Sequence, residues 1–216
     1  EPGMAKAMRS YGATEEESRE ADIRGCYETG VRANEVSSAT GYVNAAKAVE
    51  YVFFNGYDKK LHEVFGLRTG EIGGENGADA CGINDEKGGN APFETFEKFY
   101  AAVKAQLKAL LEKTMRVADE YEKYFSYINP SLMYSATVEG ALEKGKDAYQ
   151  SGVKYNNSSV LTAGFATLTD AVSAVKEFVY EKKRITLAQL KQALSDNWSG
   201  YGNLRATVLA SPHKYG

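Results

Sequence analysis

The residues best suited to chemistry are a cysteine and a glutamate two positions apart, Cys26 and Glu28, within the stretch Gly25–Gly30. A cysteine can act as a nucleophile or carry a radical, and a nearby carboxylate can act as a base. Glycine at both ends of the stretch indicates a short, flexible turn. The context alone leaves a second interpretation open, in which Cys26 is a small buried hydrophobic residue and Glu28 a surface carboxylate.

The segments before this turn are predicted to be two helices and a strand. Apolar residues at helical spacing indicate a helix over 3–10, and Thr14 followed by three glutamates indicates an N-capped helix that runs to about residue 21. Residues 23–26 are then expected to form a brief strand, which delivers Cys26 to the turn.

The segments after the turn are predicted to be a polar stretch, a helix and a long irregular stretch. Residues 30–40 are too poor in apolar side chains for a core element, and the apolar spacing of 42–54 indicates a helix that Asn55-Gly56 ends. Residues 58–92 are dense in glycine, which indicates an irregular insertion that is either surface decoration or a functional lid. Its acidic residues do not have the spacing of a calcium loop.

The second half of the chain is predicted to alternate helices with strands. The expected elements, in order, are a long helix over 93–127, a strand over 132–137, a turn-rich segment over 140–145, a buried strand over 160–165 preceded by polar residues 154–159, and helices over 169–180, 187–198 and up to about 209. This alternation indicates an α/β architecture.

The overall composition is that of an ordinary globular protein, since 43% of the 216 residues are hydrophobic and 25% are charged. A net charge of −3 without a polybasic tract gives no electrostatic reason to expect nucleic acid or an anionic membrane as a partner. No apolar run approaches the roughly 20 residues that span a bilayer, so a cytoplasmic location is expected. In that reducing compartment, Cys26 and Cys81 would be free thiols.

Three stretches carry a resemblance to a known family. They are Ala21–Glu28 around the cysteine, Thr40–Gly56, and Glu143–Ser159 with its continuation to Phe178 and Ile185–Leu187. Together they resemble the glycyl radical enzymes, the relatives of pyruvate formate-lyase. The resemblance implies an α/β fold that is half of the ten-stranded α/β barrel of these enzymes, helix-rich, with residues 1–216 forming part of one barrel domain and the Gly-rich insertion at about 58–92.

The resemblance also implies roles for the two central residues. In such enzymes, a cysteine on a loop inside the barrel becomes a thiyl radical and takes a hydrogen atom from the substrate, and Cys26 matches that position. Members that eliminate water, amine or sulfite, and some that decarboxylate, have a glutamate two residues later, as Glu28 is here. This implies a dehydratase or a C–N, C–S or C–C lyase acting on a small polar substrate, with Cys26 abstracting hydrogen and Glu28 as the base.

The sequence departs from the family pattern in one respect. The family stores its radical on a glycine in a C-terminal Arg-Val-x-Gly-Tyr motif, and no such motif occurs here. The resemblance therefore implies a C-terminal-half fragment that is inert alone, with the glycyl radical on a residue outside the chain. It further implies a radical-SAM activating enzyme as a partner, no cofactor bound by the chain itself, and a homodimer for the full-length protein.

Polar residues after the cysteine turn are candidates for binding the substrate. Ser38, Thr40 and Tyr42 are polar where a core would be apolar, although they could equally form an N-cap cluster ahead of the helix predicted from Tyr42. Asn156, between Tyr155 and Asn157, could position a substrate or brace the radical loop. The alternative for these three residues is ordinary turn chemistry before a strand.

Two other functions stay open. A structural or binding protein could keep this barrel region and lose the radical chemistry, as the missing glycine motif would allow. A cysteine hydrolase would use Cys26 as its nucleophile and would need His62 or His213 as a base. The same two histidines are too isolated in the sequence to indicate a metal site.

Overall fold

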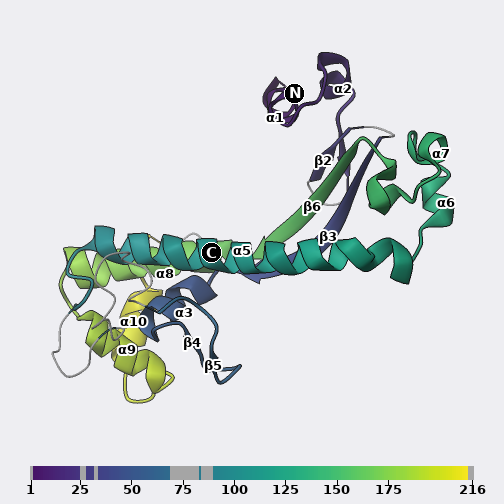
Figure 1. Ribbon diagram of the computed structural model, residues 1–216. Coiled ribbons are helices and arrows are strands. Elements are labelled where there is room, and N and C mark those ends of the chain that lie inside the picture. Colours follow the sequence, from purple (N-terminus) through teal and green to yellow (C-terminus); the bar gives the residue numbers. More distant parts are fainter. Residues whose placement is uncertain (1, 25–27, 32–33, 69–82, 84–89, 214–216) are drawn as a thin grey trace. The chain divides into compact units, whose positions relative to one another are not determined.

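The computed structural model describes residues 2–24, 28–31, 34–68, 83 and 90–213 (Figure 1). Within these ranges, eight side chains also lie outside the described part, one in a helix and seven in strands. They are those of Pro2, Arg24, Glu28, Thr29, Ser37, Ser38, Ala39 and Thr40. The chain falls into two units. Unit 1 comprises Glu1–Gly41 and Thr114–Leu161, and unit 2 comprises Tyr42–Lys113 and Thr162–Gly216.

Unit 1 begins with two short helices that lead into the strands on either side of the cysteine turn. Its elements are α1 (Pro2–Ser10), α2 (Glu15–Arg19), β1 (Asp22–Arg24), β2 (Glu28–Gly30), the first part of β3 (Glu35–Asn44), the second part of α5 (Phe96–Ile128), α6 (Leu132–Ser135), α7 (Ala141–Lys144), the irregular turn η1 (Ala148–Gly152) and most of β6 (Tyr155–Ala163). Thr14 caps α2 because its hydroxyl oxygen accepts the Glu17 N–H while the Glu17 carboxylate accepts the Thr14 N–H.

Unit 2 is mostly helical. Its elements are the end of β3, α3 (Lys47–Phe53), β4 (Tyr57–Asp58), β5 (Glu63–Val64), the first part of α5, the end of β6, α8 (Phe165–Val175), the π-helical segment η2 (Lys176–Glu181), α9 (Leu187–Ser195) and α10 (Gly202–Leu209). Asn55 and Gly56 follow α3 with positive φ angles of 53° and 77°, which confirms the helix end predicted there.

The described strands form three two-stranded sheets: β1 with β2, β3 with β6, and β4 with β5. The first and last pairs are antiparallel hairpins. In the β3–β6 pair, the Tyr155 N–H donates to the Asn34 carbonyl (3.2 Å) where the strands begin, and the Ala45 N–H donates to the Ala163 carbonyl (2.9 Å) where they end. The two strands therefore run in the same direction, and the crossover that a parallel pair requires includes α5.

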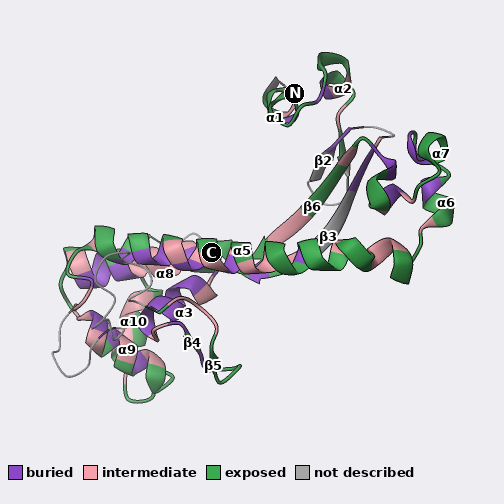
Figure 2. Cartoon of the chain, viewed as in Figure 1, coloured by how far each residue is buried: buried purple, intermediate pink, exposed green. Residues whose placement is uncertain are grey.

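The core of unit 2 is aromatic. Phe99 on α5 is fully buried, and its ring lies 5.9 Å from that of Phe53 and 6.1 Å from that of Phe93, both in edge-on geometry. Figure 2 shows buried stretches, in purple, on α3 and on α5. Unit 1 has two smaller hydrophobic clusters instead. One contains Val36 with Val138, Ala141, Ala148 and Val153, and the other contains Met8, Ala13 and Val31.

Strand β3 corrects two expectations from the sequence. The helix predicted over 42–54 begins only at Lys47, because residues 42–44 are the end of β3 and residues 45–46 form a turn. Burial there alternates with the period of a strand, since Tyr42 is 74% exposed while Val43 and Ala45 are buried. The same strand corrects the expectation that 30–40 holds no core element, because Val36 is fully buried.

Two predicted strands were also placed wrongly. Residues 132–137, expected as a strand, form the one-turn helix α6, whose short apolar run has no period of its own. The strand expected to be buried over 160–165 is β6, which begins at Tyr155 and is partly exposed along its length. Gly164, with a φ of 72°, ends it, and Phe165 already begins α8.

The helices predicted at both ends of the chain are confirmed as α1, α2, α9 and α10, and the long central helix as α5, with small shifts at their ends. The segment over 140–145, predicted as turns, contains the short helix α7. Of the insertion predicted at about 58–92, residues 69–82 and 84–89 lie outside the described part, and its beginning belongs to the β4–β5 hairpin.

Candidate active site

The β1–β2 hairpin flanks the cysteine turn. Its register pairs Asp22 with Gly30 and Arg24 with Glu28. Residues 25–27, with Cys26 at their centre in the sequence, join the paired ends and lie outside the described residues. Glu28 opens β2, so its backbone is described while its side chain is not. Cys26 and Glu28 as one catalytic pair therefore stay a prediction from the sequence.

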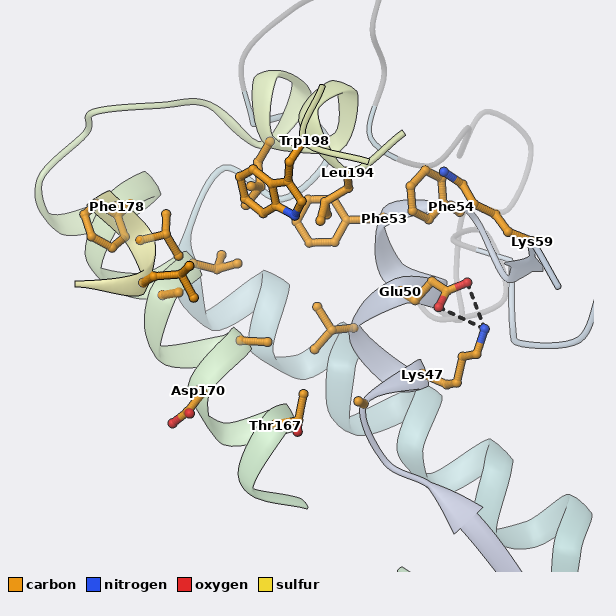
Figure 3. Close-up of a pocket in the computed structure, with 18 of the residues that line it drawn as sticks. Lys47, Glu50, Phe53, Phe54, Lys59, Thr167, Asp170, Phe178, Leu194 and Trp198 are labelled. Atoms are coloured by element: carbon orange, nitrogen blue, oxygen red, sulfur yellow. Dashed lines mark hydrogen bonds and ion pairs between the residues drawn. The ribbon is translucent and has the colours of Figure 1, made fainter. Parts of the chain in front are cut away.

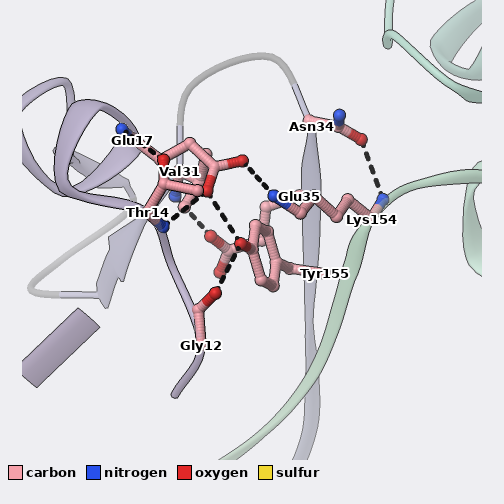
Figure 4. Close-up of polar contacts among 8 residues, drawn as sticks. All are labelled: Gly12, Thr14, Glu17, Val31, Asn34, Glu35, Lys154 and Tyr155. Atoms are coloured by element: carbon pink, nitrogen blue, oxygen red, sulfur yellow. Dashed lines mark hydrogen bonds and ion pairs between the residues drawn. The ribbon is translucent and has the colours of Figure 1, made fainter. Parts of the chain in front are cut away.

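A buried carboxylate, Glu35, holds the segment that leaves this hairpin. Glu35 is 2% exposed at the start of β3. Its Oε2 accepts a hydrogen bond from the N–H of Val31, the residue directly after β2 (Figure 4). Its Oε1 accepts one from Nδ2 of Asn157 at 2.5 Å. The side chain thus links the end of β2 to β6 within unit 1.

A second carboxylate in unit 1, Glu17, joins α2 to the start of β6. Its Oε1 accepts from the Lys154 ammonium at 2.6 Å, and its Oε2 accepts from the Thr14 N–H at 2.8 Å and lies 2.9 Å from the Tyr155 hydroxyl (Figure 4). The Lys154 bond and the Thr14 N–H lower the pKa of Glu17 from 4.5 to about 2, so the group is ionised at neutral pH.

The backbone of the same corner is fixed by Asn34. Its Oδ1 accepts the Lys154 N–H at 2.8 Å, and its carbonyl accepts the Tyr155 N–H. Beside these groups lies a polar pocket of about 440 Å³, lined by Thr14, Glu16, Glu17, Glu20, Val31, Asn34 and Glu139. The pocket is acidic and borders the segment held by Glu35.

The residues predicted to bind the substrate lie on two paired strands. Ser38 and Thr40 are in β3 and Asn156 is in β6, all in unit 1. Asn156 is exposed, and the side chains of Ser38 and Thr40 lie outside the described part. Tyr42 is in the stretch of β3 that belongs to unit 2 and is 74% exposed. Their role in substrate binding stays a prediction.

The interpretation of the sequence missed the two carboxylates that organise this corner. Glu17 could have been assigned a capping role from its place three residues after Thr14, but nothing near it in the sequence points to Lys154. Glu35 carries no local signal at all, because its partner Asn157 is 122 positions away. Tyr155 and Asn157 had been singled out, and the structure gives both of them carboxylate partners.

Comparison with known proteins gives this corner a context. The sequence pattern that describes the family "Pyruvate formate lyase-like" matches residues 2–216. The chain belongs to the pyruvate formate lyase-like family. Within these glycyl radical enzymes its relatives are of the dehydratase and lyase branch, as the resemblance of the Cys26–Glu28 stretch predicted.

Two curated relatives of this family member are dehydratases. The chain is 29% identical over 213 residues to trans-4-hydroxy-L-proline dehydratase of Clostridioides difficile. The aligned region covers 99% of this chain and 25% of the relative. It is 28% identical over 207 residues to (2S)-3-sulfopropanediol dehydratase of Klebsiella oxytoca, with coverage of 95% and 23%. The chain thus spans about a quarter of the length of these curated relatives.

A solved structure of the family matches the fold. The crystal structure of hydroxyproline dehydratase from Clostridioides difficile, with trans-4-hydroxy-L-proline bound, superposes with a TM-score of 0.76 at 27% identity. The match covers 94% of this chain and 23% of that one. The chain is therefore a helix-rich α/β region that corresponds to part of a glycyl radical enzyme.

Unit 2 of this family member contains a larger pocket of a different kind. Its volume is about 880 Å³, and its walls are mainly apolar side chains from α3, α8, η2, α9 and α10. Phe53, Leu194 and Trp198 lie together on one wall, and the ion pair between Lys47 and Glu50 lies on another (Figure 3). Among the residues that the structure describes, none of those predicted as catalytic or substrate-binding lines this pocket.

A buried carboxylate near that pocket, Asp58, has only local partners. Its Oδ2 accepts from the Tyr51 hydroxyl at 2.6 Å and lies 3.1 Å from Lys47 Nζ, and its Oδ1 accepts from the N–H groups of Lys60 and Leu61. Burial acts to raise the pKa of Asp58, but these hydrogen bonds outweigh it and hold the pKa well below its usual value.

Two further features are absent from the described part of the chain. There, no group of three or more His, Cys, Asp or Glu side chains could hold a metal ion. Likewise, none of the helices that the structure describes is long and apolar enough to cross a membrane.

Proposed function

We propose that this chain is the cysteine-bearing part of a glycyl radical enzyme that catalyses radical elimination on a small polar substrate, as a dehydratase or a C–N, C–S or C–C lyase. One observation carries the proposal: in a chain matched by this family over 2–216, the Gly-Cys-x-Glu sequence of residues 25–28 follows β1, and its glutamate opens the paired strand β2. The relatives named above that share 28–29% identity with it are dehydratases.

Cys26 and Glu28 divide the chemistry between them. The Cys26 thiyl radical takes a hydrogen atom from a substrate carbon that bears a hydroxyl group, so an S–H bond forms as the C–H bond breaks. The hydroxyl proton of the resulting carbon radical is far more acidic than that of an alcohol, and the Glu28 carboxylate removes it. The group on the neighbouring carbon departs with its electron pair and takes up that proton, and the thiol returns its hydrogen atom to the product radical.

The spacing of the two residues suits this division. Side chains two positions apart in extended backbone point to the same side, so a thiol and a carboxylate can face two adjacent substrate carbons. Holding both groups against one substrate contributes to the rate of such a step. Ser38, Thr40, Tyr42 and Asn156, on the neighbouring strands, are proposed to bind the polar groups of the substrate.

The radical that oxidises the Cys26 thiol comes from outside these residues. A glycyl radical, on a glycine that is not in this chain and is installed by a radical-SAM activating enzyme, supplies the ability to remove the hydrogen atom of the Cys26 thiol. The proposal includes the reducing cytoplasm, where Cys26 stays a thiol, a homodimeric full-length protein, and a place for β1, β2, β3 and β6 in half of the ten-stranded barrel of the family.

The test uses the complete polypeptide encoded by the reading frame that holds these residues, activated anaerobically. Offered trans-4-hydroxy-L-proline and (2S)-3-sulfopropanediol, which the curated relatives' names specify, together with a panel of other vicinally substituted small molecules, the protein should release a dehydrated or eliminated product detectable by mass spectrometry. Glu28→Gln should lower the rate by about 10²- to 10⁴-fold, the range of general acid–base catalysis.

Glu63→Gln is the matched control, because Glu63 is an exposed glutamate that also opens the second strand of a hairpin. It should leave the rate unchanged. Turnover of Glu28→Gln at the wild-type rate would overturn the role of Glu28. A complete polypeptide that cannot acquire a glycyl radical would instead favour the non-catalytic structural or binding protein.

A further inference from the structure

Glu35 is a carboxylate in a place where a carboxylate is costly. It is 2% exposed, and removing a charged group from water is unfavourable unless hydrogen bonds compensate for the loss. An apolar residue of similar volume at such a site often gives equal or greater stability. The benefit of a carboxylate here therefore lies in what its two oxygens hold in place.

Glu35 Oε2 holds the backbone directly after the β1–β2 hairpin, the cysteine hairpin, whose two strands flank Cys26 in the sequence. The Val31 N–H donates to Glu35 Oε2, and Val31 directly follows the last residue of β2, Gly30. The Val31 side chain is itself buried against Met8 and Ala13. Both the backbone and the side chain at the end of β2 are thus fixed.

The other oxygen holds the neighbouring sheet. Asn157 Nδ2 donates to Glu35 Oε1 at 2.5 Å from within β6. Val36, the residue after Glu35, is fully buried in the hydrophobic cluster that contains Val138 and Val153. In the sequence, Glu35 therefore lies between two buried valines, Val31 and Val36. Its hydrogen bonds connect the end of the hairpin to β6, the strand that contains Asn156.

We propose that Glu35 is a positioning residue: through Val31 it fixes the strand that begins with Glu28, and through Asn157 it fixes that strand relative to β6. The inference rests on the proposed function, since that function gives the geometry of the hairpin a rate to control. Glu35 touches no substrate in this account and acts through the Val31 N–H, directly after β2, and through the Asn157 side chain.

The expected effect of Glu35→Ala in the complete activated polypeptide is a fall in kcat of about 10- to 100-fold, because a displacement of about 1 Å in a reacting group can cost two orders of magnitude. The glycyl radical content, measured by electron paramagnetic resonance, should stay at the wild-type level. Glu35→Gln keeps one acceptor for the Val31 N–H and should restore part of the rate. Asn157→Ala should cause a smaller loss, and combining it with Glu35→Ala should add little further loss.

A second measurement, which does not need turnover, distinguishes a local effect of Glu35 on the cysteine hairpin from a general loosening of the fold. Cys26 and Cys81 are the two cysteines of the chain, so alkylation of each can be followed by mass spectrometry in the polypeptide before activation. Glu35→Ala should change the alkylation rate of Cys26 severalfold and leave that of Cys81 unchanged. Asp58→Asn, which removes the charge of a carboxylate that is equally buried in unit 2, is the matched control and should not change the Cys26 rate selectively.

Each outcome decides the inference. A Glu35→Ala protein with wild-type kcat per radical and wild-type Cys26 alkylation would overturn it, and so would a parallel change at Cys26 and Cys81, which would show general loosening. Failure of the proposed function looks different: a Cys26→Ala protein would then keep its activity, while the ratio of the two alkylation rates would still report whether Glu35 fixes the hairpin.

Discussion

Unit 1 and unit 2 each start a helix with a capping box, and the two boxes differ in charge and in reach. In unit 1, Thr14 and Glu17 cap α2, and the Glu17 carboxylate also binds Lys154, 137 positions away. In unit 2, Thr186 and Gln189 cap α9 through the same two hydrogen bonds, at 2.9 and 3.1 Å. Gln189 is neutral, so the same local device depends on pH in unit 1 only.

Glu35 and Asp58, one buried carboxylate from each unit, differ in the same way. Glu35 of unit 1 joins the end of β2 to Asn157, 122 positions away. Asp58 of unit 2 joins Tyr51, seven positions away, to the turn that follows it. Asp58 thus closes a local turn in unit 2, where another buried carboxylate, Glu177, binds Lys182 and accepts from the Ser211 hydroxyl, 34 positions away. In unit 1, charge connects distant segments around the cysteine hairpin, which is where a catalytic site needs its geometry specified.

The largest effect on stability is expected from the aromatic core of unit 2. Phe99→Ala removes a fully buried ring that packs on Phe53, Phe93 and Tyr180, and it should cost about 3–5 kcal/mol of unfolding free energy. Denaturant unfolding measures this. Tyr100→Ala, on the next residue of α5 and 43% exposed, is the control and should cost about 1 kcal/mol. Equal costs for the two variants would show that unit 2 does not depend on this core.

Asp58→Ala is expected to have the next largest effect. It leaves the buried Tyr51 hydroxyl and two backbone N–H groups without their acceptor, at a cost of about 3 kcal/mol. Tyr51→Phe removes only one of these hydrogen bonds and should cost about 1 kcal/mol. Both are measured by denaturant unfolding, and both should leave kcat per radical of the activated polypeptide unchanged at a temperature where the protein is folded. A fall in kcat for Asp58→Ala would erase the contrast with Glu35.

Thr186→Ala tests the neutral capping box. The variant removes the hydroxyl oxygen that accepts the Gln189 N–H and should cost about 1 kcal/mol. Because no charge is involved, the cost should be the same at pH 7 and at pH 3. Thr207→Ala is a control in the same unit, since its hydroxyl only bonds the Asn203 carbonyl one turn back in α10, and it should change stability by less than about 0.5 kcal/mol.

Glu17→Gln tests the charged box and should have the smallest effect at neutral pH, because exposed ion pairs contribute little. The effect of Glu17→Gln is expected mainly in the pH dependence of the unfolding free energy. The pKa of Glu17 is lowered from 4.5 to about 2 in the folded protein, so its contribution to stability is complete above pH 4.5 and is lost as the pH falls towards 2.

The wild-type chain should therefore lose unfolding free energy between about pH 5 and pH 2 in part through Glu17, and Glu17→Gln should show a shallower slope over that window. Gln189→Glu is the matched variant in unit 2. It places a carboxylate in the other capping box, where no lysine of the described part of the chain bonds to Gln189, and it should introduce a smaller pH dependence. Identical pH profiles for wild type and Glu17→Gln would contradict the charged connection to Lys154.

The sequence was a good guide to the parts of the fold that are local. The capping boxes at Thr14 and Thr186 and the apolar repeat of α5 each lie within one stretch, and the helices predicted from them are confirmed. Strand β3 was missed because Tyr42 and Val43 fit a helical repeat as well as an alternating one, and only pairing with β6 decides between them. Short apolar runs such as Leu132–Ser135 carry too few residues to show any period.

In the candidate site, too, residues close in the sequence could be predicted and partners far apart in the sequence could not. Cys26 and Glu28 are neighbours in the sequence, so their chemistry could be predicted from spacing and from family resemblance, and the family is confirmed. Glu35 could not be assigned its role, because Asn157 becomes its partner only once β3 and β6 are side by side. Long-range partners of this kind depend on the tertiary fold, which no local pattern encodes.

The central claim is that Cys26 carries the hydrogen transfer, and the most direct measurement compares the two cysteines of the chain. In the complete, anaerobically activated polypeptide, Cys26→Ala and Cys81→Ala should both acquire the glycyl radical at the wild-type level by electron paramagnetic resonance. Turnover per radical should be abolished by Cys26→Ala and unchanged by Cys81→Ala. Turnover by Cys26→Ala at a rate comparable to that of wild type would contradict the account.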